Sequence, residues 1–380
     1  MRVAFFHPCL MSGGIQRVFL NLARGFLEHG LAVDLVQATP ENEMRDQVPA
    51  GVRLVDLNAH RALASLWPLV RYLRRERPDA MICGAIQTNI AAIWARRLSG
   101  VPTKLILTEH NVVSVIAANA RTLRAKVTPW FVRRFYPWAE ELVAVSHGAA
   151  ADLACLLGIP VRKIRVIYNP IIGPDLWNRI EEPLEHAWFA EGQKPVLIAV
   201  GRLHYHKDYP TLLRAFAILR KSVDCRVMFL GDGEERGNLE ALARELGVEA
   251  NVLFAGTVPN PLPYMRRAAV LVLSSIVESL SIALIEGLAA GVPIVATDCP
   301  VGPREVLMDG AYGTLVPVGD PVAMAGAVKE VLQSPRPRMS KDNLQRFEHR
   351  AAVEAYLNLL TNESVGLPFI PDTSSCASYK

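Results

Sequence analysis

Short apolar runs alternate with longer amphipathic stretches along most of this chain. Such runs are typical of strands buried on both faces of a parallel sheet, and the stretches between them are typical of the covering helices. We expect helices in stretches such as 15–29 and 62–76. We expect strands at 2–6, 32–37, 52–56, 80–83, 104–108, 141–145 and 164–168, then at 196–200, 226–230, 252–255, 270–273 and 294–296. This order predicts an α/β protein with doubly wound sheets.

The length of 380 residues suggests two domains, at roughly 150 residues each. The stretch 171–194 is rich in proline, glycine and charge, and we expect it to link domain 1–170 to domain 195–342. The stretch 343–360 is expected as a last helix, and 361–380 as a disordered tail. Two such Rossmann-like domains facing each other bind ligands in the cleft between them, so the loops after the strands should carry the chemistry.

Charge is distributed unevenly along the chain. Residues 1–180 hold 22 Lys and Arg against 13 Asp and Glu, although the net charge of the whole chain is only +4. A basic front half suggests an anionic partner there, such as nucleic acid, a phospholipid surface or a phosphorylated substrate. A solvated basic face explains the same numbers. The mean hydropathy is +0.20, yet we find no uncharged apolar run of about 18 residues that would predict a membrane span.

Glycines follow the first expected strand, where Gly13 and Gly14 precede a helix. Paired glycines let a backbone approach a phosphate or sugar closely, and a helix N-terminus adds partial positive charge. An ordinary turn between a strand and a helix has the same pattern. A second loop carries Arg202 and Lys207, two cations that can neutralise a diphosphate as its charge grows, unless they are simply surface residues.

The strongest signal lies at 278–286, where Glu278 follows an expected strand and Glu286 falls inside the next helix. A helix beginning near Ser281 would leave the amides of Ile282 and Ala283 open to an anion. Glu286 can accept hydrogen bonds from a ribose diol, and Glu278 can meet sugar hydroxyls. A carboxylate near a helix start also gains from the helix dipole without any ligand.

Together these motifs resemble glycosyltransferase family 4, the group 1 glycosyltransferases. The resemblance covers about residues 1–345 and includes Glu278 with Glu286, the segment 291–297, Arg202 with Lys207, and Gly13-Gly14. Asn169-Pro170 and Gly231-Asp232-Gly233 also match in place. It implies a GT-B fold, a retaining transfer of a sugar from a nucleotide sugar, and a C-terminal helix that packs back on the first domain.

The resemblance also implies roles for single residues. Arg202 and Lys207 should hold the donor diphosphate, and Glu286 the ribose. Glu278 should hold the donor sugar, and His110, in Thr108-Glu109-His110-Asn111, should face that sugar from the acceptor-binding first domain. The family usually has Glu-Gly-Phe-Gly where this chain has Glu278-Ser279-Leu280-Ser281, which leaves the donor open.

Other patterns bear on cofactors. No two aspartates are separated by one residue, so the chain lacks the pair that holds a metal on a diphosphate, and its six cysteines show no CxxC spacing. We expect no metal and no cofactor beyond the nucleotide sugar. Gly231-Asp232-Gly233 imitates a dinucleotide fingerprint, but Glu234 and Glu235 would repel a pyrophosphate. We interpret it as a turn between a strand and a helix.

Two front-domain stretches, 61–75 and 121–138, mix Arg and Lys with Trp, Tyr and Phe. Such stretches can lie on an anionic membrane, although a helix with its apolar side in the core has a similar composition. The resemblance implies a lipid-linked acceptor for many bacterial relatives. We expect a cytoplasmic protein at the inner face of the membrane, with no nucleic-acid partner because no recognised module is present.

These arguments predict a retaining, metal-independent glycosyltransferase. It would move a hexose or an N-acetylhexosamine from a nucleotide sugar, with uridine as the expected base, to a glycan or lipid-linked acceptor. The expected setting is bacterial cell-envelope polysaccharide or lipopolysaccharide biosynthesis. Two alternatives stay open: a nucleotide-sugar epimerase of the same fold, and a non-catalytic partner subunit.

Overall fold

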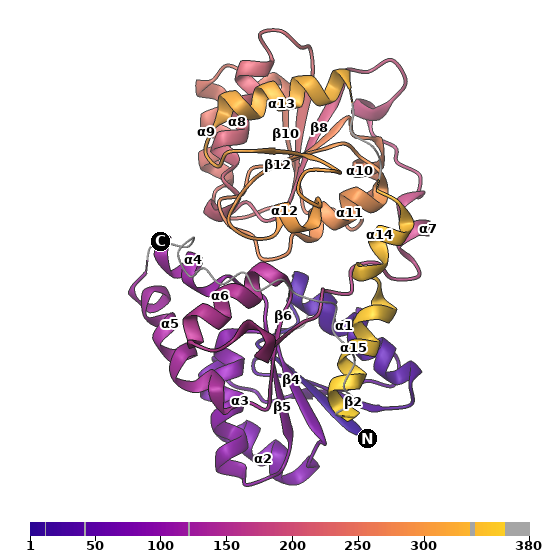
Figure 1. Ribbon diagram of the computed structural model, residues 1–380. Helices are drawn as coiled ribbons and strands as arrows, with labels where there is room; N and C mark the ends of the chain where they lie inside the picture. Colours follow the sequence, from indigo (N-terminus) through magenta and orange to yellow (C-terminus); the bar gives the residue numbers. More distant parts are fainter. Residues whose placement is uncertain (12, 42, 121, 335–338, 362–380) are drawn as a thin grey trace. The chain divides into compact units, whose positions relative to one another are not determined.

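A computed structural model describes residues 1–11, 13–41, 43–120, 122–334 and 339–361. The chain forms two compact units (Figure 1). Of the described residues, the first unit contains those within Met1–Ile171 together with 346–361, and the second contains those within Ile172–Gln345. The predicted tail, 361–380, lies outside the described residues except for Thr361, which ends the last helix.

The first unit is built on a seven-stranded sheet in the order β3-β2-β1-β4-β5-β6-β7. Each described pairing in it is parallel. The order reverses between β1 and β4, so the loops after these two strands flank the switch point where ligands bind in such sheets. The strands are β1 Arg2–His7, β2 Ala32–Gln37, β3 Arg53–Asp56, β4 Ala80–Cys83, β5 Lys104–Glu109, β6 Glu141–Ala144 and β7 Ile164–Val166.

Helices cover both faces of this sheet (Figure 1). One face packs against α1 and α15, whose apolar side chains meet Phe5 and Leu35, and the other packs against α2, α3, α5 and α6. Burial on both faces explains why a central strand such as β4 is apolar throughout, whereas the edge strand β3 has a charged residue at each end. The helices are α1 Gly14–Glu28, α2 Leu66–Glu76, α3 Ile86–Ser99, α4 Val113–Ala118, α5 Leu123–Phe135, α6 His147–Leu157 and α15 His349–Thr361.

The second unit repeats this plan with a six-stranded sheet in the order β10-β9-β8-β11-β12-β13. All five described pairings are parallel, and the order reverses between β8 and β11. The strands are β8 Val196–Val200, β9 Arg226–Leu230, β10 Val252–Gly256, β11 Val270–Leu273, β12 Ile294–Thr297 and β13 Thr314–Val316.

One face of the second sheet carries α8, α9 and α13, while α10 and α11 lie on the other (Figure 1). Gly287 lets α11 approach the sheet closely, because a Cβ there would collide with the side chain of Leu271. The helices are α7 Leu176–Ile180, α8 Tyr209–Leu219, α9 Arg236–Glu245, α10 Leu262–Arg267, α11 Ile282–Ala290, α12 Pro303–Val306, α13 Pro321–Gln333 and α14 Lys341–Leu344.

The last helix, α15, returns to the first unit. Nε2 of His349 lies 2.7 Å from the carbonyl oxygen of Asn21 on α1, and the hydroxyl of Tyr356 lies 2.9 Å from Oγ1 of Thr108. Gly25 on α1 gives Val353 its space, since a Cβ at Gly25 would collide with that side chain. The predicted fold class, two Rossmann-like α/β units with a returning C-terminal helix, is confirmed.

The structure departs from the predictions at several places. The expected helix 343–360 is interrupted: α14 ends at Leu344, a 3-10 turn spans Gln345–Phe347, and α15 begins at His349. The stretch 62–76 likewise divides into a 3-10 turn and α2. Residues expected as the linker pack on the second unit, where Leu176 and Ile180 are buried and Asn260 donates to the carbonyl of Arg179. Strand β13 was not predicted.

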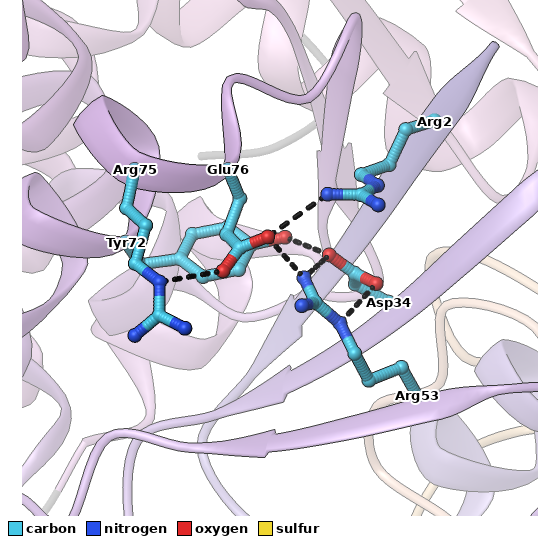
Figure 2. A network of polar contacts seen from close by, with 6 residues as sticks. All are labelled: Arg2, Asp34, Arg53, Tyr72, Arg75 and Glu76. Carbon is cyan, nitrogen blue, oxygen red and sulfur yellow. Dashed lines mark hydrogen bonds and ion pairs between the residues drawn. The ribbon is translucent and has the colours of Figure 1, made fainter.

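A polar network joins the amino-terminal edge of the first sheet to α2 (Figure 2). Arg53 donates two hydrogen bonds to the buried carboxylate of Asp34, and the hydroxyl of Tyr72 donates a third at 2.6 Å. Glu76 accepts from Arg2 and Arg53, each at 2.9 Å, and these contacts hold the pKa of Glu76 below its usual value, with Arg53 as the main cause. This network lies at the edge of the sheet opposite to the loops that follow the strands β1 and β4.

Candidate active site

Two loops flank the switch point of the second sheet, one after β8 and one after β11. The β8 loop carries Arg202 and Lys207, and the β11 loop carries Glu278 and leads into α11. The backbone ties the two loops together, because the amide of Ile276 donates to the carbonyl of His206 at 2.9 Å and Oγ of Ser274 donates to that of Lys207 at 2.6 Å. The predicted donor-site cations and Glu278 are therefore gathered at one edge of one sheet.

Lys207 and Glu278 form the central ion pair of this cluster. Nζ of Lys207 lies 2.5 Å from Oε1 of Glu278, and the hydroxyl of Ser275 donates to the same oxygen at 2.7 Å. The Glu278 side chain is only 10% exposed, whereas an unpaired carboxylate rarely remains at such depth. Gly302, with φ of +96°, leaves room for it, because a Cβ there would lie 3.2 Å from Cβ of Glu278.

Arg202 has a different environment. Its side chain is 72% exposed and lies 3.1 Å from Oε2 of Glu234, while Nε2 of His204 lies 3.4 Å from the other carboxylate oxygen. An exposed pair of this kind contributes little to stability, so Arg202 can exchange Glu234 for another anion at small cost. Glu234, expected from the sequence only to repel a pyrophosphate, is the ion-pair partner of Arg202.

Helix α11 offers main-chain donors beside these cations. Its N-cap, Ser281, makes no side-chain cap, and the first turn contains no acidic residue. Within the described residues, Oγ of Ser281 is buried without a hydrogen-bond partner. The first amides of any helix lack partners inside that helix, so those of Ile282 and Ala283 are suited to bind an anion. Glu286 is buried one turn further along.

The glycines of Gly231-Asp232-Gly233 allow the turn after β9 to pack closely against the β8 loop. A Cβ at Gly231, whose φ is +143°, would collide with the carbonyl oxygen of Gly201, and one at Gly233 would collide with that of Leu203. The amide of Leu203 donates to the carbonyl of Asp232 at 2.9 Å. These glycines therefore let the turn after β9 support the β8 loop. A turn was predicted here, but the close approach could not be inferred from the residues.

The first unit presents a second set of predicted residues. Gly13 is the N-cap of α1, with an extended backbone and no side-chain cap, and Gly14 begins that helix. Ser12, which precedes them, lies outside the described residues. His110 follows β5 and is 7% exposed. A Cβ at Gly84, in the loop after β4, would lie 3.2 Å from Nε2 of His110 and 2.6 Å from Cζ of Phe19, so this ring borders the switch point of the first sheet.

Burial determines the charge of this histidine. It lowers the pKa of His110 to about 4, because an imidazolium ion loses its hydration in the protein interior. The residue is therefore neutral near pH 7. A neutral imidazole can donate one hydrogen bond or accept one, which suits contact with a sugar hydroxyl better than contact with a phosphate.

Comparison with known proteins identifies the family. Glycosyltransferase Family 4 matches residues 12–172, and Glycosyl transferases group 1 matches residues 182–350. The N-acetylgalactosamine-N,N'-diacetylbacillosaminyl-diphospho-undecaprenol 4-alpha-N-acetylgalactosaminyltransferase of Campylobacter jejuni is 30% identical over 263 residues, 69% of this chain and 69% of that protein. The chain belongs to glycosyltransferase family 4, the group 1 glycosyltransferases. The predicted family is thereby confirmed.

Further relatives of this glycosyltransferase match over nearly its full length. The lipopolysaccharide core biosynthesis glycosyltransferase LpsE of Rhizobium meliloti is 26% identical over 380 residues, covering 96% of this chain and all of LpsE. Anabaena HepE in complex with UDP and glucose has a TM-score of 0.77 at 18% identity, covering 95% of this chain and 100% of HepE. The lipopolysaccharide outer core galactosyltransferase WaaB has a TM-score of 0.71 at 20% identity, covering 96% of this chain and 100% of WaaB. These structural likenesses establish the GT-B fold.

None of the described helices of this glycosyltransferase has both the length and the apolar character that crossing a membrane requires. The described residues contain no group of three or more His, Cys, Asp or Glu side chains that could hold a metal ion. The roles assigned to single site residues stay predictions.

Proposed function

We propose that this glycosyltransferase transfers a hexose or an N-acetylhexosamine from a nucleoside-diphosphate sugar with retention of configuration and without a metal ion. The observation that carries the proposal is the convergence of Lys207, Glu278 and the uncapped start of α11 at the switch point of the second sheet. The relatives add support, since HepE binds UDP and glucose, and an N-acetylgalactosaminyltransferase and a galactosyltransferase are among them.

The diphosphate is assigned to the cations and the main-chain amides. As the glycosidic bond breaks, negative charge accumulates on the leaving diphosphate. Lys207, Arg202 and the amides of Ile282 and Ala283 then act as preorganised positive groups that stabilise this charge, the task that a metal ion performs in other enzymes. Arg202 releases Glu234 to do so, and the hydroxyl of Ser281 gains a partner.

The sugar and the ribose are assigned to the carboxylates. Glu286 accepts hydrogen bonds from the ribose diol, and Glu278, already oriented by Lys207 and Ser275, accepts them from hydroxyls of the donor sugar. His110 contributes a neutral imidazole to the donor sugar from the first unit, and Gly13 and Gly14 supply close backbone approach at the start of α1. The acceptor hydroxyl attacks from the face that the diphosphate leaves, and a diphosphate oxygen takes its proton.

The acceptor is proposed to be a lipid-linked glycan. The names of two Campylobacter relatives specify undecaprenol diphosphate carriers, and LpsE is named for lipopolysaccharide core biosynthesis. We assign the same setting, assembly of a bacterial envelope polysaccharide or lipopolysaccharide at the inner face of the cytoplasmic membrane. Exposed aromatic residues on the first unit, Trp67 in α2 and Trp130 in α5, support contact with a lipid surface.

A donor screen tests this function. UDP-glucose, UDP-galactose, UDP-N-acetylglucosamine and UDP-N-acetylgalactosamine are each added to the protein, and UDP release is followed with and without an undecaprenol-diphosphate-linked sugar. We expect acceptor-stimulated UDP release with one of the four donors, undiminished by EDTA. Loss of turnover in EDTA would contradict metal independence. An interconverted nucleotide sugar without transfer would identify an epimerase.

A further inference from the structure

His110 lies between two residues that are bonded to each other. Oε1 of Glu109 accepts hydrogen bonds from the backbone amide of Asn111 at 3.0 Å and from Nδ2 of Asn111 at 3.1 Å. The residue before the imidazole thus holds the residue after it. Because both neighbours are fixed, the backbone of His110 has little freedom to rotate.

The other oxygen of Glu109 anchors this turn to the core. The hydroxyl of Tyr136, a fully buried side chain, donates to Oε2 of Glu109 at 2.9 Å. Nδ2 of Asn89 on α3 donates to the Tyr136 oxygen at 2.8 Å. The chain Asn89–Tyr136–Glu109–Asn111 therefore runs from two packed helical segments to the turn that carries His110.

Burying the carboxyl group of Glu109 costs free energy. Glu109 is 1% exposed, and none of the residues that hydrogen-bond it is a cation. Burial, with a smaller effect of the Asp152 carboxylate, raises the pKa of Glu109 to about 7 even though its hydrogen bonds act in the opposite direction. An apolar side chain would fill this space without that cost, so filling the core does not explain a carboxyl group at this position.

We propose that Glu109, held by Tyr136, is a positioning residue that orients His110 toward the donor sugar. This inference rests on the role proposed for His110. Glu109 itself is buried beneath the turn and touches no reacting atom. Glu109 acts on the position of His110 through the backbone of His110 and Asn111. The placement of a residue that contacts substrate depends on supporting hydrogen bonds of this kind.

The first unit provides a matched control at its opposite edge. The hydroxyl of Tyr72 donates to the buried carboxylate of Asp34 at 2.6 Å, as the hydroxyl of Tyr136 donates to Glu109, although Asp34 also accepts from Arg53 (Figure 2). Tyr72→Phe and Tyr136→Phe each remove one hydroxyl from a buried carboxylate of the same unit. Only the second should disturb His110.

The experiment measures kcat, the KM for the donor that responds best in the UDP-sugar panel, and the Kd for UDP. We expect Tyr136→Phe and Glu109→Gln to lower kcat by about tenfold to a hundredfold, as displaced catalytic groups do, and to leave the Kd for UDP unchanged because UDP is assigned to the second unit. Tyr72→Phe should lower the melting temperature by about as much as Tyr136→Phe does, while its kcat stays within about twofold of the native value.

A double-mutant comparison tests whether Glu109 acts through His110. In the His110→Ala background, Glu109→Gln should cause no further loss of kcat, since the residue it orients is gone. An equal loss in both backgrounds would overturn the proposal, as would an unchanged kcat in Glu109→Gln. If His110→Ala alone leaves kcat unchanged, the assigned role of His110 fails and the inference fails with it, whereas absence of UDP release from the native protein would refute the proposed function itself.

Discussion

Nζ of Lys207 lies 2.5 Å from Oε1 of Glu278, and this contact joins the loop after β8 to the loop after β11. The pair has two consequences. It keeps a carboxylate at a depth where an unpaired charge would be costly, and it holds a cation ready at the place assigned to the diphosphate. In the proposed complex, Lys207 would contact both Glu278 and the diphosphate.

Removing the charge of Glu278 should separate these roles. Glu278→Gln keeps the shape of the side chain but not the counterion. We expect kcat to fall by about 10²- to 10³-fold, because charge placed for the transition state is lost. The Kd for UDP should stay equal or decrease, since Lys207 no longer has a competing carboxylate. Isothermal titration with UDP and initial rates with the active donor give the two quantities.

Ser275→Ala serves as the control for this variant, because it removes only one of the two contacts that orient Glu278. Its effect on kcat should be about tenfold or less. Equal weakening of UDP binding and turnover in Glu278→Gln would mean that the residue supports the loops and does not act on the sugar.

Glu286 should act on the ribose and on nothing further along the donor. Glu286→Ala is expected to raise the KM for the donor by about tenfold, the typical value of one hydrogen bond to a charged group, with little change in kcat. The diagnostic comparison is UDP against 2′,3′-dideoxy-UDP. The native protein should prefer UDP, and the variant should bind both equally.

Glu330→Ala, at an exposed position of α13, controls for the loss of one negative charge from the same unit. If Glu286→Ala still distinguishes UDP from its dideoxy analogue, the ribose contact belongs to another residue.

Gly231 should prove essential to the donor site because it supports the β8 loop. Gly231→Ala places a Cβ against the carbonyl oxygen of Gly201 at a φ of +143°, where a side chain is strained. We expect the variant to lose about 2 kcal/mol or more of unfolding free energy and to bind UDP poorly, because the β8 loop must move. Urea denaturation and UDP titration measure both effects.

Gly237→Ala is the natural comparison, since nothing lies within 4 Å of the added Cβ in that helix. It should raise stability by about 0.5–1 kcal/mol and leave UDP binding intact. A harmless Gly231→Ala would show that the two loops do not depend on one another.

Much of this architecture is predictable from local pattern. Strands such as β4 and β11 are apolar and buried over their whole length. Runs of this kind, with less complete ones elsewhere, predicted twelve of the thirteen strands that the described residues form. The exception, β13, has only three residues at the sheet edge, and two of them are half-buried, so no apolar run marks it. The break before α15 has no proline or glycine to announce it.

The site shows a similar limit. Residue types at strand ends indicated Lys207, Glu278 and the start of α11, because parallel strands bring their carboxyl ends to one edge. Pairings between loops remained hidden, since they depend on register and side-chain direction. The Arg202–Glu234 ion pair and the hydrogen bond from Tyr136 to Glu109 are two examples, because neither partner could be inferred from the residue types.

Acid should weaken the first unit through His7. Burial lowers the pKa of this side chain to about 4 from an ordinary value of 6.5. Between these values the folded protein binds fewer protons than the unfolded chain, so the free energy of unfolding rises with pH and is lost as pH falls. His7→Asn keeps a donor for the carbonyl of Cys9 but cannot titrate. It should reduce the slope of unfolding free energy with pH by up to about 1.4 kcal/mol per pH unit.

His29→Asn tests whether burial is the cause, because exposed His29 also directs Nδ1 to a carbonyl, that of Gly25. That variant should leave the slope unchanged. The opposite trend of Glu109, whose pKa is raised to about 7 by burial, is the same in each protein and cancels in the comparison. An unaltered slope in His7→Asn would mean that another group controls acid sensitivity.

Membrane contact should depend on the exposed side of α5. Trp130 is 61% exposed and shares that side with Leu123, Val127 and Phe131, at helical spacing, while Arg134 lies one turn further on. Aromatic rings favour the membrane interface, and each basic residue near an anionic surface adds about 1 kcal/mol. We expect the native protein to float with vesicles containing phosphatidylglycerol at low salt and less so at high salt.

Trp130→Ser should lower the bound fraction severalfold, whereas Val322→Ser, at an exposed apolar position of the second unit, should not. Equal binding by the two variants would move the contact elsewhere, and a native protein that stays with the supernatant at low salt would leave these residues as part of a solvated face.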